Sequence, residues 1–124
     1  MRIFKNKPFL RFARKEGVSD ADLCEAIGRA DDGHIDADLG GGVIKQRIAR
    51  DGEGKSGGFR TIILFQKADR AFFVYGFAKK DRDNITKDEL AAFRKLAQQM
   101  LAMNDSALKA AIKNQTITEV KCDG

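Results

Sequence analysis

Six cationic side chains lie along or just after the predicted strands, and their types suit chemistry on a phosphate group. They are Lys45, Arg47, Arg60, Lys79, Lys80 and Arg82. When RNA is cleaved by its own 2′-hydroxyl, negative charge builds up on the scissile phosphate, and fixed guanidinium or ammonium groups stabilise it. A lysine among other cations can also lose its proton and act as a base. Charge alone does not establish this chemistry, because basic residues at strand ends usually form a solvated edge.

Other catalytic and ligand-binding patterns are incomplete in this chain. Lys55-Ser56 follows Gly54 as at the end of a phosphate-binding loop, but two glycines and a strand come next instead of a helix. His34 is the sole histidine, so hydrolase sites of the Ser-His-Asp or Cys-His kind lack their base. The acidic residues around it match neither calcium nor zinc spacing, and we interpret them as a solvated loop. These acidic residues are Asp31, Asp32, Asp36 and Asp38. We expect neither a metal nor a cofactor.

The two cysteines, Cys24 and Cys122, lie far apart and form no CxxC pair. This spacing indicates neither a disulfide framework nor a zinc site. We expect Cys24 to be buried in an amphipathic helix and Cys122 to be inert in the tail.

Length and composition indicate one globular domain over residues 1–124, since 43% of the residues are hydrophobic and 33% are charged. No apolar stretch approaches the about 20 residues that cross a bilayer, and the N-terminus has no segment of signal-peptide type. We expect a cytoplasmic protein. The net charge of +5 is unevenly spread. Basic residues prevail in 1–17 and 40–82 and acidic ones in 18–39, an asymmetry that suits a polyanionic partner.

The residue pattern in the first half of the chain predicts a short strand at 2–5, then two helices and a strand. The first helix runs from Phe9 to Lys15 and stops at Gly17, and the second is capped by Ser19 and ends at Gly33. From residue 43 polar and apolar residues alternate, which places Lys45 and Arg47 on one sheet face.

The second half predicts a flexible connection at 51–58, strands at 59–66 and 71–78, and two helices. Thr86 and Glu89 form a capping box for the first of these helices. The second covers 105–113 with Asp105 or Ser106 as its cap, and 116–120 is a terminal strand or an extended tail.

Two strand segments carry a resemblance to a known family. Residues 57–63 (GGFRTII) and 74–82 (VYGFAKKDR) resemble the paired-strand signature of RelE/HigB-type toxins of bacterial type II toxin-antitoxin systems, in the RelE/ParE superfamily. Residues 38–47 (DLGGGVIKQR) are similar to the entry strand of one RelE-like branch. The element order agrees over nearly the whole chain.

The resemblance implies a single α+β domain in which two N-terminal helices pack on a mostly antiparallel sheet of three to five strands, followed by C-terminal helices. The helices would cover one face, and the other would hold basic residues against mRNA in the ribosomal A site. Members of this family cleave mRNA without a metal ion. Their cognate antitoxin, by this resemblance a helix-turn-helix protein, would lay an acidic or apolar segment over the basic surface.

Matched by position, Arg60 falls at the family's phosphate-binding arginine and Lys80 at the basic position that closes the third strand. Lys45 and Arg47 occupy the alternating basic sites. The resemblance therefore implies catalytic roles for Lys45, Arg60 and Lys80, with Lys45 as the proton acceptor. It implies RNA binding by Arg47, Lys79 and Arg82.

Well-known members place a tyrosine or histidine near the C-terminal end of the site, where this chain has Thr86, while Tyr75 lies mid-strand. The resemblance thus assigns no general acid. Two other functions stay open: a ParE-like toxin that poisons DNA gyrase, and a nucleic-acid-binding module without catalysis, whose cations would only neutralise phosphates.

Overall fold

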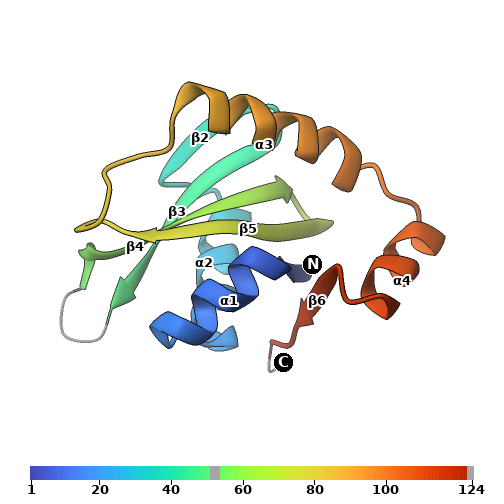
Figure 1. Cartoon of the computed structure of the whole chain (residues 1–124), viewed down its shortest axis with the longest axis horizontal. Coiled ribbons are helices and arrows are strands. Elements are labelled where there is room, and N and C mark those ends of the chain that lie inside the picture. Colours follow the sequence, from blue (N-terminus) through green and yellow to red (C-terminus); the bar gives the residue numbers. More distant parts are fainter. Residues whose placement is uncertain (51–53, 123–124) are drawn as a thin grey trace.

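A mixed sheet with helices on both faces organises the computed structural model, which describes residues 1–50 and 54–122 (Figure 1). The strands are β1 (Arg2–Asn6), β2 (Ala37–Gly40), β3 (Val43–Arg50), β4 (Gly54–Gln66), β5 (Arg70–Ala78) and β6 (Ile117–Val120). The helices are α1 (Lys7–Glu16), α2 (Asp20–Asp31), α3 (Lys87–Met100) and α4 (Asp105–Lys113). The strand order is β2-β3-β4-β5-β1-β6, and only β1 and β5 pair in parallel. The α+β class and the mostly antiparallel pairing are confirmed, but the sheet has six described strands where at most five were expected.

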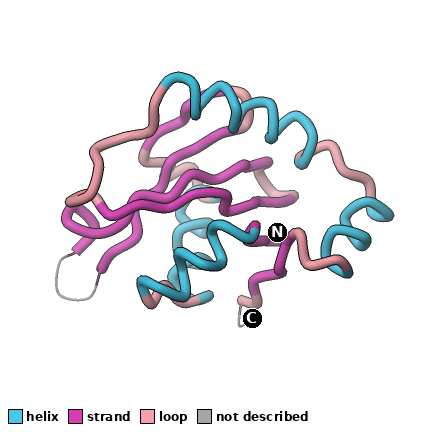
Figure 2. Tube along the Cα trace, in the orientation of Figure 1, coloured by secondary structure: helices cyan, strands magenta, loops and turns pink. Residues whose placement is uncertain are grey.

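The two N-terminal helices pack on one face of the sheet, as predicted (Figure 2). Phe9 of α1 and Leu23 and Ile27 of α2 are buried against Ile63 and Phe73 of the sheet. Ser19 caps α2 with a reciprocal capping box. The Ser19 hydroxyl accepts from the Asp22 amide, and the Asp22 carboxylate accepts from the Ser19 amide.

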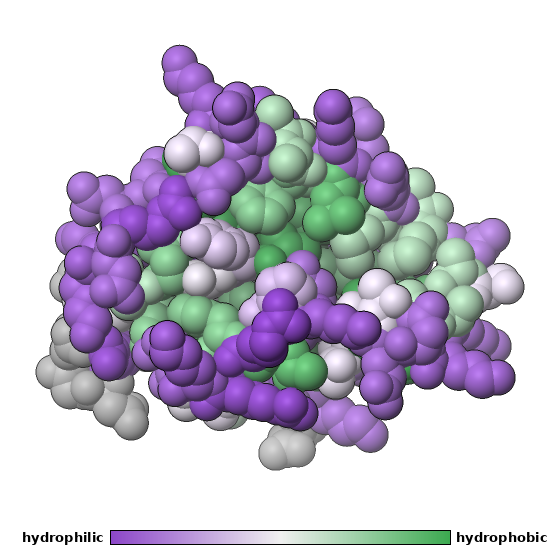
Figure 3. Space-filling model, viewed as in Figure 1, coloured by the Kyte–Doolittle hydropathy of each residue, from purple (hydrophilic) through white to green (hydrophobic). Residues whose placement is uncertain are grey.

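The opposite face is also covered, by α3 and α4, so the expectation that helices lie on one face alone is wrong. The apolar stripe of α3 explains this, because it needs a surface to pack on. Of that stripe only Ala97 is buried, and Leu90 and Phe93 are half-buried. Hydrophobic side chains accordingly remain visible below α3 in Figure 3. α3 therefore covers its face incompletely.

The predicted capping box of Thr86 and Glu89 begins α3. α4 is capped by Asn104 and not by Asp105 or Ser106, because the Asn104 side chain accepts from the Ala107 amide. Among the described residues no helix is long and apolar enough to cross a membrane.

Three glycines between β2 and β3 let α3 come close to the sheet. Gly40, Gly41 and Gly42 all have positive φ, at 81°, 64° and 82°. A Cβ on Gly42 would lie 2.8 Å from a methyl group of Leu101. The hairpin strand β2 was not predicted. Residues 54–58 of the connection predicted at 51–58 belong to β4, which begins at Gly54, and residues 51–53 lie outside the described chain.

The terminal segment forms strand β6 and brings the two cysteines together. Cys24 and Cys122 form a disulfide across 98 residues of sequence, so the prediction that they are unpaired is wrong. β6 pairs antiparallel with β1 at the sheet edge, and the Lys121 amide donates to Asp20 at the start of α2 over 3.3 Å. Because this pairing is long-range, the cysteine spacing could not reveal it.

Breaking this disulfide should lower the free energy of unfolding by about 4 kcal/mol, since the bond closes a long loop in the unfolded chain. Urea unfolding of the oxidised chain with and without reductant measures the loss. A Cys24→Ser, Cys122→Ser variant is the control and should not respond to reductant. Equal stability of the oxidised and reduced forms would contradict this expectation.

Candidate functional site: a basic face on β3, β4 and β5

A buried glutamine sets the position of β3. Gln46 is fully buried on the α2 side of the sheet, where its amide donates to the carbonyls of Ala26 at 3.0 Å and His34 at 3.2 Å. Its side-chain oxygen accepts from the Asp36 amide at 2.6 Å. Since side chains alternate along a strand, its neighbours Lys45 and Arg47 lie on the opposite face.

The acidic segment before β3 helps to hold this strand. The Asp36 carboxylate accepts from the backbone amide of Arg47 at 2.7 Å and pairs with Arg29 at 3.4 Å. Arg29 also donates to the Arg47 carbonyl at 2.6 Å. Asp36 therefore has a structural role, and the interpretation of the whole segment as solvated is too simple. No group of three or more His, Cys, Asp or Glu residues in the described chain is arranged to hold a metal ion.

Strand register places three of the six predicted cations in two adjacent rows. In one row Arg47, Arg60 and Phe77 lie opposite one another across β3, β4 and β5. In the next row the corresponding residues are Lys45, Ile62 and Tyr75. We call the surface made by Lys45, Arg47, Arg60 and Tyr75 the basic face. It lies on the α3 side of the sheet, beside the apolar cluster that α3 and the sheet form.

Tyr75 reaches this face because of a β-bulge. Ile62 pairs with Tyr75 and Ile63 with Phe73, which leaves Val74 as an extra residue in β5. Tyr75 therefore packs with the core below α3, on the same side as Val74. Strict alternation would have turned its hydroxyl to the α1 side. The sequence did not identify Tyr75 as a site residue because it lies in the middle of the strand.

Arg60 is the most deeply set cation of the basic face. Only 8% of its surface is exposed, whereas Arg47 opposite it is exposed. Burial lowers the pKa of the Arg60 guanidinium, and the positive charge of Arg47 lowers it further. Arg47 and Arg60 are Cα partners on neighbouring strands, and like charges placed there repel each other. This pair is therefore suited to bind a phosphate, which can accept from both.

Arg82 holds Tyr75 in place. Its guanidinium donates to the Tyr75 hydroxyl at 3.0 Å and to Glu89 at 2.6 Å, and it lies over the rings of Tyr75 and Phe77. The hydrogen bonds to Glu89 and then to Tyr75 raise the pKa of Arg82. The bond from Arg82, followed by that from the Thr86 backbone, lowers the pKa of Glu89 to about 2. Glu89 compensates the charge of Arg82, and the hydrogen bond from Arg82 holds the Tyr75 hydroxyl.

Lys45 is part of the basic face, and Lys79 and Lys80 lie at its border. Lys45 donates to the side chain of Asn84 at 3.3 Å, in the loop between β5 and α3. Lys79 and Lys80 are exposed in the turn after β5, and the Lys79 amide donates to the Gly58 carbonyl at 3.2 Å. This bond ties the turn to β4 two residues from Arg60. Nothing in the sequence indicated a role for Asn84, and Glu89 was recognised only as a member of the capping box.

The Arg82–Glu89 pair makes a pH-dependent contribution to stability. Because folding lowers the Glu89 pKa from 4.5 to about 2, the contribution is complete above pH 4.5 and is lost as the pH falls towards 2. The variant Glu89→Gln keeps the capping box. Above pH 4.5 we expect it to be less stable than the original chain, with a gap in urea unfolding that closes on acidification. Asp88→Asn on the same helix is the control, and a gap that does not change with pH would contradict the ion pair.

One comparison with known proteins identifies a family. The chain matches the model described as RelE toxin of the RelE / RelB toxin-antitoxin system over residues 1–120, which is nearly its whole length. No curated protein matches it. The match includes all the strands that form the basic face and confirms the resemblance noted in the sequence. The chain belongs to the RelE toxin family.

Proposed function

We propose that this chain cleaves mRNA on the ribosome without a metal ion, as the toxin of a type II toxin-antitoxin system. The observation that carries the proposal is the side-by-side placement of Arg47 and Arg60, one row from Lys45 and Tyr75. Such an arrangement supplies two guanidinium groups for a phosphate and two side chains that can exchange protons.

In this mechanism the 2′-hydroxyl attacks the adjacent phosphorus and the 5′-oxygen leaves. Arg60 and Lys80 stabilise the charge that builds up on the phosphate, and Lys45 accepts the proton of the 2′-hydroxyl. Arg47 and Lys79 hold the RNA backbone. The low exposure of Arg60 supports its role, because a fixed donor loses no energy to reorganisation during the reaction.

Tyr75 is the general acid in this proposal and donates a proton to the leaving 5′-oxygen. Arg82 donates to the phenol oxygen, so the Tyr75 hydroxyl keeps its own proton free for donation. Lys45 and Tyr75 lie in one row with Ile62 between them, two strand spacings or about 10 Å apart along the backbone. This separation suits a base and an acid on opposite sides of a phosphate, as in-line displacement requires.

The antitoxin, as a helix-turn-helix protein, would bind this toxin in the cytoplasm and restrain it. mRNA and the ribosome are the other partners. The match to a family defined by a toxin-antitoxin pair supports the antitoxin as a partner.

Arg60→Lys should reduce cleavage about a hundredfold, because an ammonium group keeps the charge but cannot bind the phosphate through two donors. The measurement is primer extension on ribosome-bound mRNA incubated with purified protein. Arg14→Lys, an exposed change on α1, is the matched control and should cleave normally. If Arg60→Lys cleaves as fast as the original chain, charge alone suffices, and the proposed geometry is wrong. If the original chain binds RNA without cleaving it, the chain is a binding module.

Tyr75→Phe should slow cleavage of ordinary RNA by a factor of about a hundred, because the leaving oxygen is no longer protonated. The ring still packs against Phe77 and Phe93, so the fold should persist. An RNA with a 5′-bridging sulfur has a leaving group that needs no proton. The Tyr75→Phe variant should therefore cleave this RNA at nearly the rate of the original chain. A defect of the same size on both substrates would exclude Tyr75 as the acid.

A further inference from the structure

One loop is bonded to both side chains to which the proposed mechanism assigns proton transfer. We call residues 79–86, which join β5 to α3, the β5-α3 loop (Figure 1). Lys45 lies on β3 and Tyr75 on β5, one on each side of β4. Hydrogen bonds from the loop and from the start of α3 reach each of them. The mechanism above gives no role to Asn84 or Glu89, on which these bonds depend.

Asn84 holds the amine of Lys45. The Lys45 Nζ donates to the Asn84 Oδ1 at 3.3 Å. The same oxygen accepts from the Ile85 amide at 2.9 Å, which fixes the Asn84 side chain against the backbone of the loop. A neutral amine can donate one proton to such an acceptor and keep its lone pair free. The uncharged amide therefore orients Lys45 as a base without favouring its protonated form, as a carboxylate would.

Glu89 holds Tyr75 through Arg82. The two carboxylate oxygens of Glu89 accept from Arg82 at 2.6 and 3.2 Å, and the Thr86 amide donates to the same carboxylate at 2.7 Å. Arg82 donates to the Tyr75 hydroxyl at 3.0 Å. Two bonds to one carboxylate fix the plane of a guanidinium, which a single bond does not. Glu89 thus determines where Arg82 directs its bond to the phenol oxygen.

A further hydrogen bond joins the two halves of this arrangement. The Arg82 Nε donates to the backbone carbonyl of Asn84 at 2.9 Å. An unbroken series of hydrogen bonds therefore links the base to the acid, and Glu89 anchors it at the start of α3. A displacement of about 1 Å in a reacting group can slow a reaction about a hundredfold. The β5-α3 loop is thus suited to set the distance between the two groups.

We propose that Asn84 and Glu89 are positioning residues of the nuclease reaction, Asn84 for Lys45 and Glu89 for Tyr75. This inference rests on the proposed function, which assigns proton transfer to Lys45 and Tyr75. Asn84 and Glu89 transfer no proton themselves, and each acts through the side chain that it holds. A role in folding alone would affect both halves of the reaction equally, so that the two roles can be separated by experiment.

The first test measures single-turnover cleavage of ribosome-bound mRNA that carries either an ordinary or a 5′-sulfur-bridged scissile bond. Glu89→Gln places an amide nitrogen opposite Arg82 and should slow cleavage of the ordinary RNA about tenfold, but not that of the sulfur-bridged RNA. Asn84→Ala keeps the carbonyl that Arg82 uses and should slow cleavage of both RNAs about tenfold, because both need the base. Asp88→Asn and Gln98→Ala, exposed changes on α3, are the matched controls and should cleave both RNAs normally.

Double variants distinguish positioning from a general loss of structure. Asn84→Ala should add nothing to the defect of Lys45→Ala, because the amine that it holds is already absent. For the same reason Glu89→Gln should add nothing to the defect of Tyr75→Phe. Asn84→Ala combined with Tyr75→Phe should instead lose the product of the two separate factors, since the changes affect different proton transfers.

An NMR signal tests the hold on Tyr75 without RNA. Tyr75 is the sole tyrosine of the chain, so labelling tyrosine with ¹³C at the ζ carbon gives one signal, from the carbon that bears the hydroxyl. Glu89→Gln should shift this signal, since it alters the bond from Arg82. Asn84→Ala and Asp88→Asn should leave the signal in place.

Four results would overturn the inference while the nuclease proposal stands. They are normal cleavage of ordinary RNA by either single variant, equal slowing of both RNAs by Glu89→Gln, further slowing by Asn84→Ala in the Lys45→Ala chain, and an unchanged ¹³C signal in Glu89→Gln. If the original chain leaves ribosome-bound mRNA intact, the nuclease proposal fails, and the inference fails with it.

Discussion

The buried side chain of Gln46 fixes the strand on which the basic face depends. Its donors and acceptor are satisfied by Ala26, His34 and Asp36 on the α2 side. A slip of β3 by one residue would turn Lys45 or Arg47 into this position and bury a charge. It would also leave polar groups unpaired, at about 1–3 kcal/mol each. The register of β3 is therefore strongly determined, and it places Arg47 opposite Arg60.

Local patterns predicted the elements that local physics controls. The caps Ser19 and Thr86, the stop at Gly17 and the shared face of Lys45 and Arg47 follow from capping and from alternation along a strand. Long-range features were not predictable in this way. The bulge that turns Tyr75 depends on pairing with β4, and the disulfide depends on β6 returning to β1. The ion pair in which Glu89 compensates the charge of Arg82 depends on the path of the loop between β5 and α3.

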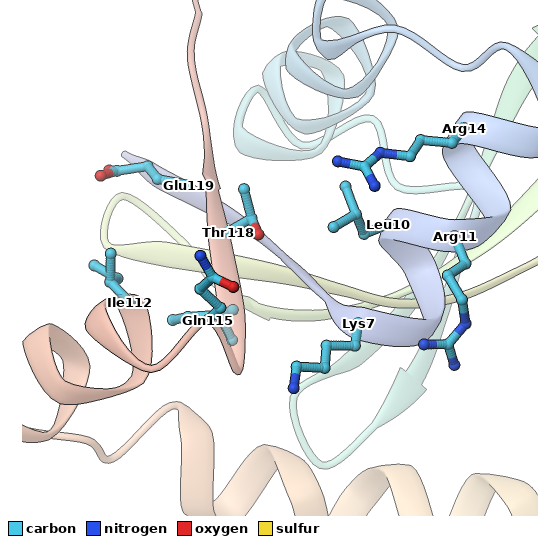
Figure 4. Close-up of a pocket in the computed structure, with 9 residues that line it drawn as sticks. Lys7, Leu10, Arg11, Arg14, Ile112, Gln115, Thr118 and Glu119 are labelled. Carbon is cyan, nitrogen blue, oxygen red and sulfur yellow. The ribbon is translucent and has the colours of Figure 1, made fainter.

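Two basic surfaces on one chain have different surroundings. On the basic face, Arg60 is nearly buried beside Arg47 and one row from Tyr75, which suits a single phosphate in a fixed position. Between α1 and β6, the cations Lys7, Arg11 and Arg14 stand on the surface of a helix, next to apolar side chains (Figure 4). β1 lies between the strands of the basic face and β6.

Mapping RNA ends in bacteria shortly after induction of this chain tests mRNA cleavage most directly. New 5′ ends are expected inside translated regions, before DNA synthesis declines, and they should be absent when Arg60→Lys is induced. Growth arrest with intact messages would contradict mRNA cleavage, and an early loss of DNA synthesis in those cells would indicate gyrase as the target instead.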